Sequence, residues 1–209
     1  MTFITLEGID GTGKSTLHAE IGVLLADMNP VMTREPGGTP TGLVIRDLIK
    51  SGTAPYTEAF LFAADHAQHL HEVIIPSIQD NRLIISDRYY DSRLAYQQVT
   101  LSLICPDPIA FIKKIHEGLT IVPDHTFLLI LDPKVAYERS KQRGITDHFE
   151  TIERLRQFQA AYLQLAEAEP SRFTIIDGAL PTQEIASCMQ VHIRNLHAKS
   201  NARRPARKI

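Results

Sequence analysis

The sequence has no tryptophan and only two cysteines, Cys105 and Cys188, which lie far apart and form no CxxC unit. Neither a disulfide framework nor a zinc ribbon is indicated by so few cysteines at this spacing, and a reducing cytoplasm is expected. Long apolar runs are absent as well: stretches such as 127–131 fall far short of the ~20 residues of a membrane span. The first residues lack the basic segment and long apolar core of a signal peptide, so we expect no export.

Charge of one sign is also scarce. Lys and Arg number 22 against 24 Asp and Glu, which gives a formal net charge of −2 and does not favour a nucleic-acid-binding protein. Hydrophobic residues make up 44%, as in an ordinary soluble domain. The exception is the segment 198–209, whose Lys and Arg residues meet no acid, and we expect it to form a basic, flexible tail.

Short apolar runs alternate with longer stretches of helical period, which indicates βαβ units and a buried parallel sheet. Asp132 can cap a helix that starts at Pro133, because an aspartate oxygen accepts from free amide groups and proline suits the first helical position. No linker or repeat is visible, so residues 1–197 are predicted to form one α/β domain. The predicted strands are Thr2–Leu6, Val31–Thr33, Leu83–Ser86, Thr126–Leu131 and Phe173–Ile176.

The segment after the first predicted strand satisfies the pattern GxxxxGK[ST] in the order strand, glycine loop, helix. Glycines let successive backbone N–H groups turn toward a polyphosphate, and the helix directs its positive dipole end at the same anion. Lys14 is predicted to reach the β- and γ-phosphates and Ser15 to ligate Mg²⁺; a tight turn that binds nothing is the alternative. The predicted ATP-binding residues are Gly8, Ile9, Asp10, Gly11, Thr12, Gly13, Lys14, Ser15 and Thr16.

A second magnesium ligand is predicted at Asp87, which ends the third predicted strand. In doubly wound sheets ligands bind at the carboxyl ends of the strands, where Asp87 would face the glycine loop. Taken alone, an Asp in this position is more typical of a cap or turn. The loop and Asp87 together predict a P-loop NTPase-type fold.

Several further segments carry the acceptor side of a reaction: REPGGT at 34–39, DRY at 87–89 and the basic stretch 139–144, in addition to Asp10 inside the glycine loop. Together these segments resemble the thymidylate kinase family, from Phe3 to about Tyr162. The resemblance implies a five-stranded parallel sheet flanked by helices, with a short mobile lid over about 139–150. It also implies transfer of the γ-phosphate of ATP to dTMP with Mg²⁺, and a homodimer.

The resemblance also implies roles on the acceptor side. Arg88, with Arg46, resembles the residues that hold the dTMP phosphate, because guanidinium groups match phosphate oxygens geometrically. Phe62 resembles the aromatic that stacks on thymine and Asp10 the carboxylate near the 3′-hydroxyl; Tyr96 is placed to exclude a 2′-hydroxyl. From the residues alone, the alternatives to these roles are that Arg46 is a solvated surface residue and that Phe62 is a core residue. The residues assigned to dTMP are Asp10, Glu35, Arg46, Phe62, His66, Arg88, Arg93, Tyr96 and Gln97.

Lid arginines are implied by Gly11, which stands where some members of the family carry an arginine. Arg143 is therefore the first candidate to stabilise the transferring phosphoryl group, and Arg139 the second. The two share a helical face by their i,i+4 spacing. Solvated charges at a helix end are the alternative. The catalytic set is thus Lys14, Asp87, Arg88, Arg139 and Arg143.

The sequence departs from the family pattern at His66, where an arginine is usual, and Arg93 replaces a small or amide residue nearby. We hypothesise that Arg93 points inward as a replacement. His148 and Leu43 are smaller departures in the lid and after Gly42. The histidines of the HxxHxH run at 66–71 are read as pocket or surface residues rather than a zinc site, since helical period separates the last from the others.

Two functional alternatives stay open. A kinase for another deoxynucleoside monophosphate such as dUMP is supported by His66, because an imidazole offers fewer donors than a guanidinium. A nucleotide-dependent switch or ATPase is less favoured, since the acceptor-side arginines would have no role in it. The implied homodimer would form through the amphipathic helix from about Thr57 to Ser77, although its apolar residues could equally bury against their own sheet.

Overall fold

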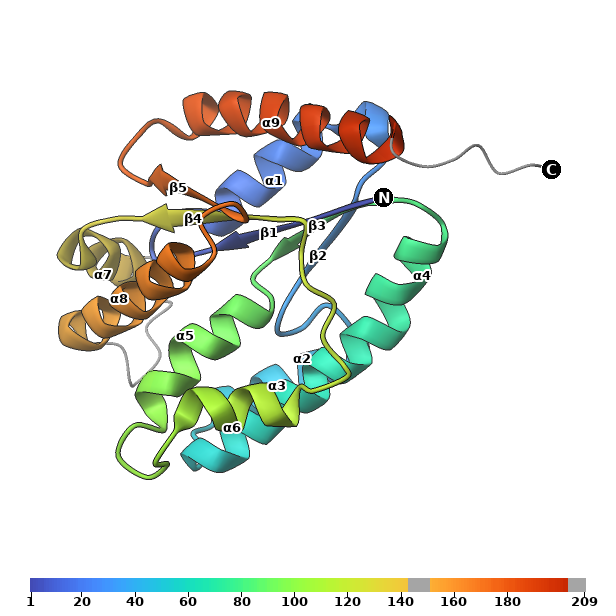
Figure 1. Ribbon diagram of the computed structural model, residues 1–209. Helices are drawn as coiled ribbons and strands as arrows, with labels where there is room; N and C mark the ends of the chain where they lie inside the picture. Colours follow the sequence, from blue (N-terminus) through green and yellow to red (C-terminus); the bar gives the residue numbers. More distant parts are fainter. Residues whose placement is uncertain (143–150, 203–209) are drawn as a thin grey trace.

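A computed structural model describes residues 1–142 and 151–202 (Figure 1). Its centre is a five-stranded, all-parallel sheet in the order β2-β3-β1-β4-β5. Each strand lies within one residue of the bounds predicted from the apolar runs, which confirms the predicted fold class. The strands are β1 (Thr2–Glu7), β2 (Val31–Arg34), β3 (Leu83–Asp87), β4 (His125–Ile130) and β5 (Phe173–Asp177).

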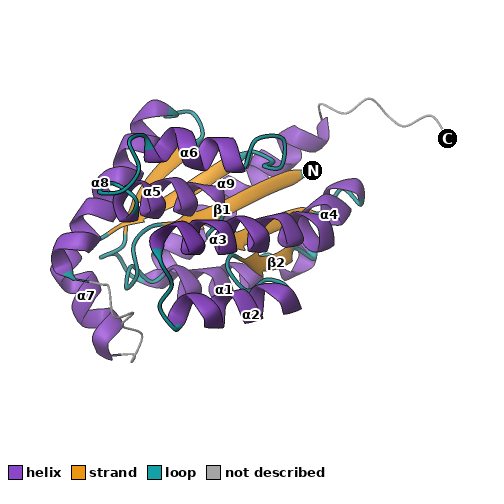
Figure 2. Ribbon diagram, turned by 90° about the horizontal axis from the view of Figure 1, so that it is seen from below, coloured by secondary structure: helices purple, strands orange, loops and turns teal. Residues whose placement is uncertain are grey.

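Helices cover both faces of the sheet. The helices are α1 (Lys14–Leu24), α2 (Pro40–Lys50), α3 (Pro55–His69), α4 (Ile75–Gln79), α5 (Tyr90–Thr100), α6 (Pro108–Ile115), α7 (Pro133–Gln142), α8 (Ile152–Ala168) and α9 (Thr182–Ala202), with a 3₁₀ turn η1 (Ala26–Met28) and a π turn η2 (Leu70–Ile74). Helices α1 and α9 pack together on one face, while α5 and α8 pack on the other. Seen from below, α3, α5 and α8 lie in front of the strands (Figure 2). No helix in the described part of the chain is both long and apolar enough to span a bilayer.

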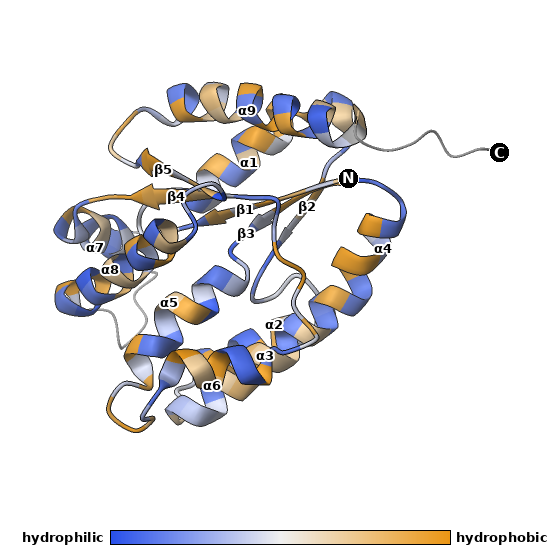
Figure 3. Ribbon diagram, in the orientation of Figure 1, coloured by the Kyte–Doolittle hydropathy of each residue, from blue (hydrophilic) through white to orange (hydrophobic). Residues whose placement is uncertain are grey.

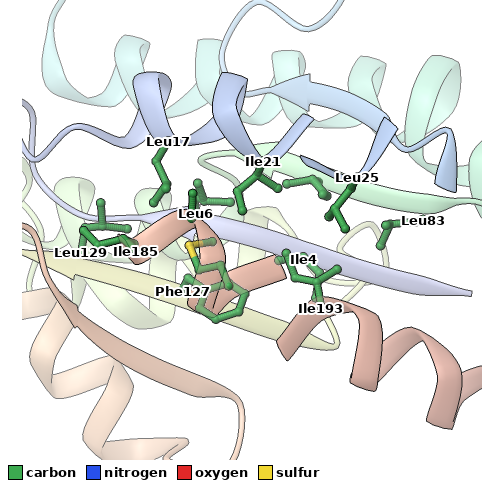
Figure 4. Close-up of a cluster of buried hydrophobic side chains, with 13 residues drawn as sticks. Ile4, Leu6, Leu17, Ile21, Leu25, Leu83, Phe127, Leu129, Ile185 and Ile193 are labelled. Carbon is green, nitrogen blue, oxygen red and sulfur yellow. The ribbon is translucent and has the colours of Figure 1, made fainter. Parts of the chain in front are cut away.

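The core lies where α1 and α9 meet the sheet. All six residues of β1 are buried, as expected of a central parallel strand covered on both faces. Figure 4 shows Leu17 and Ile21 of α1 and Ile193 of α9 directed at Ile4 and Phe127 of the strands. Hydrophobic colouring accordingly runs along β4 and β5, while the helices alternate between polar and apolar positions (Figure 3).

The helix starts agree with the capping signals. Helix α7 begins at Pro133, and the Lys134 amide donates to Asp132 Oδ1 at 2.7 Å. The helix predicted over about 57–77 runs as α3, η2 and α4 from Pro55 to Gln79. The predicted lid residues 143–150, with Arg143 and His148, and the tail residues 203–209 lie outside the described residues.

Candidate active site

The glycine loop joins β1 to the first residue of α1, so it lies at the carboxyl end of the central strand. Gly8 and Gly11 adopt φ angles of +138° and +82°, which side chains rarely tolerate. The Lys14 side chain is buried and donates from Nζ to the Ile9 carbonyl at 2.7 Å and to Thr12 Oγ1 at 3.4 Å. Burial and the nearby Arg88 charge lower the pKa of Lys14 to about 8. The loop therefore curls around an ammonium group, the geometry expected of a phosphate cradle.

Ser15 and Asp87 meet at the outer side of this loop. Ser15 Oγ donates to Asp87 Oδ2 at 2.7 Å across 72 residues of sequence. A hydroxyl and a carboxylate side by side fit Mg²⁺, which prefers oxygen ligands and keeps several waters while bound by one or two protein groups. The two predicted magnesium ligands thus lie together.

Helix α7 packs directly on the glycine loop. A Cβ built at Gly11 would lie 2.0 Å from the carbonyl oxygen of Ala136. One turn further along α7, Arg139 Nη1 donates to the Gly178 carbonyl at 3.2 Å. Between the loop, Arg139 and the segment after β5 lies a cavity of about 440 Å³, which Thr16 and Pro181 also line. The missing side chain at Gly11 is what allows α7 to approach so closely.

Arg88 follows β3 and has the unusual φ angle of +67° for a residue with a side chain. Its Nη2 donates to Asp10 Oδ1 at 2.6 Å and to the Tyr96 hydroxyl at 3.1 Å. Burial acts to lower the pKa of Arg88, but Asp10, Tyr96, Tyr162 and Glu7 together outweigh that effect and raise the pKa well above its usual value. A permanently charged guanidinium therefore lies beside the glycine loop, joined to it through Asp10.

A buried polar cluster lies behind these residues, around Glu35. His69 Nδ1 donates to Glu35 Oε1 at 2.6 Å, and His66 Nδ1 donates to Oε2 at 3.1 Å. Arg93 Nη2 donates to Glu35 Oε2 at 3.3 Å and lies 3.8 Å from Asp65 Oδ2. Burial alone would raise the pKa of Glu35, but the imidazoles and the Arg93 guanidinium hold it below its usual range.

Phe62 lies over this cluster. The Arg93 guanidinium carbon is 4.0 Å from the centroid of the Phe62 ring, close enough for a cation–π contact. Arg93 thus points inward, as the sequence suggested, but it does so under the aromatic ring and against Glu35. His66 is fully buried, so its imidazole is held by Glu35 rather than presented at the surface of a pocket.

The sequence is similar to one family of known proteins along most of its length. A family model described as Thymidylate kinase matches residues 6–188. The chain belongs to the thymidylate kinase family. A protein named Probable thymidylate kinase from Methanospirillum hungatei JF-1 is 52% identical over 182 residues, which are 87% of this chain and 88% of that protein. One of the same name from Methanoculleus marisnigri is 48% identical over 202 residues, 97% of this chain and 98% of its own length.

The remaining residues predicted from the resemblance to thymidylate kinase lie around the same edge of the sheet. Gln97 is buried, and neither of its amide atoms has a hydrogen-bond partner in the described part of the chain. Arg46 is half-buried on α2, and its Cδ lies 3.5 Å from where a Cβ on Gly37 would stand. Arg46 forms no hydrogen bond or ion pair with the residues that the structure describes.

Histidine and acidic residues form no group of three or more suited to a metal ion within residues 1–142 and 151–202. His66 and His69 face Glu35 while His71 is exposed, as helical period predicted.

Two parts of the site escaped the sequence analysis. The loop 178–181 lines the cavity beside Arg139, and its position after the fifth predicted strand, at the same edge of the sheet, was the available signal. Glu7, Ser92 and Tyr162 form a hydrogen-bonded group behind Arg88. Ser92 belongs to the sequence segment that begins with DRY at 87–89, but no motif joins it to Glu7 and Tyr162, because the three residues come from separate elements.

Proposed function

We propose that this chain transfers the γ-phosphate of ATP to dTMP, giving dTDP and ADP. The observation that carries the proposal is the 2.6 Å contact between Arg88 Nη2 and Asp10 Oδ1, because it holds the cation that we assign to the acceptor side against the glycine loop. A kinase must bring two anions end to end, and this arrangement supplies a cationic or N–H-rich surface for each. The family membership and the names of the relatives support the same reaction.

The donor side is assigned to the glycine loop and the neighbouring cavity. Backbone amides and Lys14 would hold the β- and γ-phosphates, and Ser15 with Asp87 would hold Mg²⁺, which when bound neutralises phosphate charge. The cavity of about 440 Å³ has the size of a small-ligand site and begins at Thr12 and Gly13, so it would take the adenosine part of ATP beside Arg139.

The acceptor side is assigned to Arg88, Phe62 and Gln97. Arg88, with Arg46, would hold the dTMP phosphate, and the face of Phe62 turned away from Arg93 would stack on the base. The buried, unpartnered amide of Gln97 offers one donor and one acceptor, which suits the edge of a pyrimidine. Asp10 and Tyr96 would border the sugar, and Glu35 with His66 would support Arg93 from behind.

The chemistry needs positioning and charge rather than a general base. An oxygen of the dTMP phosphate is already nucleophilic; it bonds to the γ-phosphorus while the bond to the β,γ-bridging oxygen breaks, and ADP leaves with that electron pair. Lys14, Arg88 and Arg139 supply positive charge around the transferred group. Arg143, which lies outside the described residues, keeps its role as a sequence-based prediction.

We further propose a homodimer and a cytoplasmic location. Helices α2 and α3 pack together and expose Val44, Leu48 and Phe60, an apolar surface that a second copy would cover. Both cysteines of the chain are free thiols, in keeping with a reducing compartment.

A coupled ADP-release assay over dTMP, dUMP, dCMP, dAMP and dGMP tests the reaction. We expect dTMP to give the highest kcat/KM, and Arg88→Ala to lower it by about 100-fold or more through lost phosphate binding. Arg82→Ala is the matched control, because Arg82 precedes the same strand at its opposite end and donates to Asn29; it should stay within about twofold.

Two other results would overturn the assignment. Highest efficiency with dUMP would identify a different deoxynucleoside monophosphate kinase. ATP hydrolysis that no monophosphate accelerates would favour a nucleotide-dependent switch.

A further inference from the structure

Glu7 is a fully buried carboxylate at the end of β1 for which the proposed reaction has no direct use. It lies just before the glycine loop, and within the described residues its side chain forms no hydrogen bond with either predicted magnesium ligand. Its Oε2 accepts from Ser92 Oγ at 2.6 Å and from the Tyr162 hydroxyl at 2.8 Å. Its Oε1 accepts from the Tyr89 amide at 2.8 Å. Removing a carboxylate from water costs free energy, so the burial of Glu7 among these partners needs a physical explanation.

The partners of Glu7 are also the partners of Arg88. Arg88 Nη1 donates to Ser92 Oγ at 3.2 Å and to the Tyr162 hydroxyl at 3.0 Å, so both hydroxyls stand between the guanidinium and the carboxylate. The third partner, the Tyr89 amide, follows Arg88 directly in the chain. Glu7 therefore restrains both the side chain of Arg88, through the two hydroxyls, and the backbone of Arg88, through the Tyr89 amide.

That restraint matters because the backbone of Arg88 is strained. A non-glycine residue at φ +67° is unfavourable and persists only where its surroundings determine it. Here the Arg88 amide donates to the Leu6 carbonyl at 2.9 Å, and the Arg88 carbonyl accepts from Ser86 Oγ at 2.7 Å. The bond from the Tyr89 amide to Glu7 completes the set. We propose that Glu7 is a positioning residue that orients Arg88 toward the acceptor phosphate, acting through Ser92, Tyr162 and the Tyr89 amide.

The direction of the hydrogen bonds favours the ionised form of Glu7. A guanidinium only donates, so each hydroxyl must accept from Arg88 and donate its own proton to another acceptor. An ionised Oε2 can accept both of these protons, and the two hydroxyls also lie 2.7 Å apart, so that one can donate to the other. Once Oε2 is protonated it donates to one hydroxyl and loses the negative charge that faces Arg88, so the hold on Arg88 weakens.

The surroundings of Glu7 allow this change near neutral pH. Burial and the neighbouring Asp91 raise the pKa of Glu7 to about 7, while Ser92, Arg88 and Tyr162 oppose the rise. The ionised fraction therefore grows as pH increases through about 7, and dTMP binding should tighten in the same direction. The titratable and charged groups that face Glu7 are Lys14 on α1, Arg88 after β3, Asp91 on α5 and Tyr162 on α8.

Because the inference rests on the proposed function, its test begins with dTMP binding to the wild-type protein by calorimetry, without ATP, between pH 6 and 8.5. The variants are Glu7→Gln, Tyr162→Phe and Ser92→Ala, with Ser187→Ala on the exposed side of α9 as the matched serine control. In Glu7→Gln the Tyr89 amide fixes the amide oxygen at the Oε1 position, which leaves an NH₂ group at Oε2. This variant therefore imitates protonated Glu7 at every pH.

We expect Tyr162→Phe and Glu7→Gln each to weaken dTMP binding at pH 8 by about tenfold, as for the loss of one hydrogen bond to a charged group. Ser92→Ala should have a smaller effect and Ser187→Ala none. Wild-type binding should weaken as pH falls from 8 to 6 more than Glu7→Gln binding does. The phosphate of dTMP itself titrates near pH 6, but it does so equally in both proteins. In steady state, KM for dTMP should rise while KM for ATP stays within about twofold.

Each outcome is decisive. If the wild-type protein binds no dTMP, the proposed function fails and takes the inference with it. If it binds dTMP but all three variants match its affinity and pH profile, the inference alone fails. A loss of ATP and dTMP binding together, with a lower melting temperature, would mean a merely structural role and would also overturn it. If Glu7→Gln does not fold, the Tyr162→Phe and Ser92→Ala affinities decide.

Discussion

Arg93 holds two charged partners and an aromatic ring in place at once. With only 3% of its surface exposed, the guanidinium lies against Glu35 and beneath Phe62. A buried charge is tolerable only when paired, and Glu35, whose pKa is held low, supplies the opposite charge. Asp65 is the weaker partner, since burial raises its pKa. The ring that the proposed function assigns to the base therefore rests on a cation that is itself fixed from below.

Arg93→Ala should weaken dTMP binding by about tenfold and reduce the preference for dTMP over dUMP. The ring of Phe62 would lose the surface on which it rests, and Glu35 would keep only its histidine partners. Arg93→Lys should recover little, because an ammonium lacks the planar face and fork of a guanidinium. Calorimetry with both nucleotides measures the effect, with the exposed His71→Ala as control. Unchanged affinity and selectivity in Arg93→Ala would contradict this role.

For single residues, the sequence predicts interactions within a local motif better than interactions between distant segments of the chain. Lys14 and Ser15 belong to a local motif whose loop geometry is set by its own glycines, and Asp87 follows from the rule that parallel strands end at one edge. The pairing of Glu35 with His66 and His69 is different in kind. It depends on how α3 docks against the end of β2, which the local pattern around either residue does not specify.

Among the elements, α7 is placed by a contact between backbones. Gly11→Ala would set a Cβ 2.0 Å from the Ala136 carbonyl oxygen and 2.7 Å from its carbon, so the helix rather than a side chain must move. Gly52→Ala is the matched control, since Gly52 has a similar φ of +85° with no atom within 4 Å of its Cβ position. We expect Gly52→Ala to cost about 1 kcal/mol of stability and to leave KM for ATP unchanged.

Gly11→Ala should cost more than this control and raise KM for ATP severalfold, because a displaced α7 carries Arg139 away from the cavity beside the loop. Thermal unfolding and steady-state kinetics on the two variants measure both effects. Equal losses of stability in the two variants, with unchanged ATP kinetics, would show that α7 is not seated by this contact.

The elements also show where sequence patterns stop being informative. The five strands were predictable because buried parallel strands read as short apolar runs. The π turn η2 was not, although its cause is local: Pro76 has no N–H to donate to the Glu72 carbonyl and its ring would crowd that carbonyl, so the helix widens just before it. A proline in a helical pattern predicts a disturbance without specifying whether the helix kinks, ends or widens.

For the molecule as a whole, the proposed homodimer depends on the apolar residues that α2 and α3 expose. Val44 and Leu48 stand one turn apart on α2 and are 62% and 46% exposed, and Phe60 on α3 is 55% exposed. The Tyr56 hydroxyl of α3 donates to the Ile104 carbonyl at 3.0 Å, which joins this surface to the loop between α5 and α6. A specific, stable protein–protein interface buries about 800 Å² on each partner and is apolar at its centre, and the exposed apolar residues here suit such a centre.

Phe60→Glu should therefore convert a dimer into a monomer of 23.4 kDa, because a carboxylate at the centre of an apolar interface would be buried without a partner. Val191→Glu is the matched control: Val191 is 60% exposed on α9, against the opposite face of the sheet, and the variant should remain dimeric. Sedimentation velocity on the three proteins distinguishes the masses. A monomeric wild-type protein, or dissociation by Val191→Glu but not by Phe60→Glu, would place the interface elsewhere or remove it.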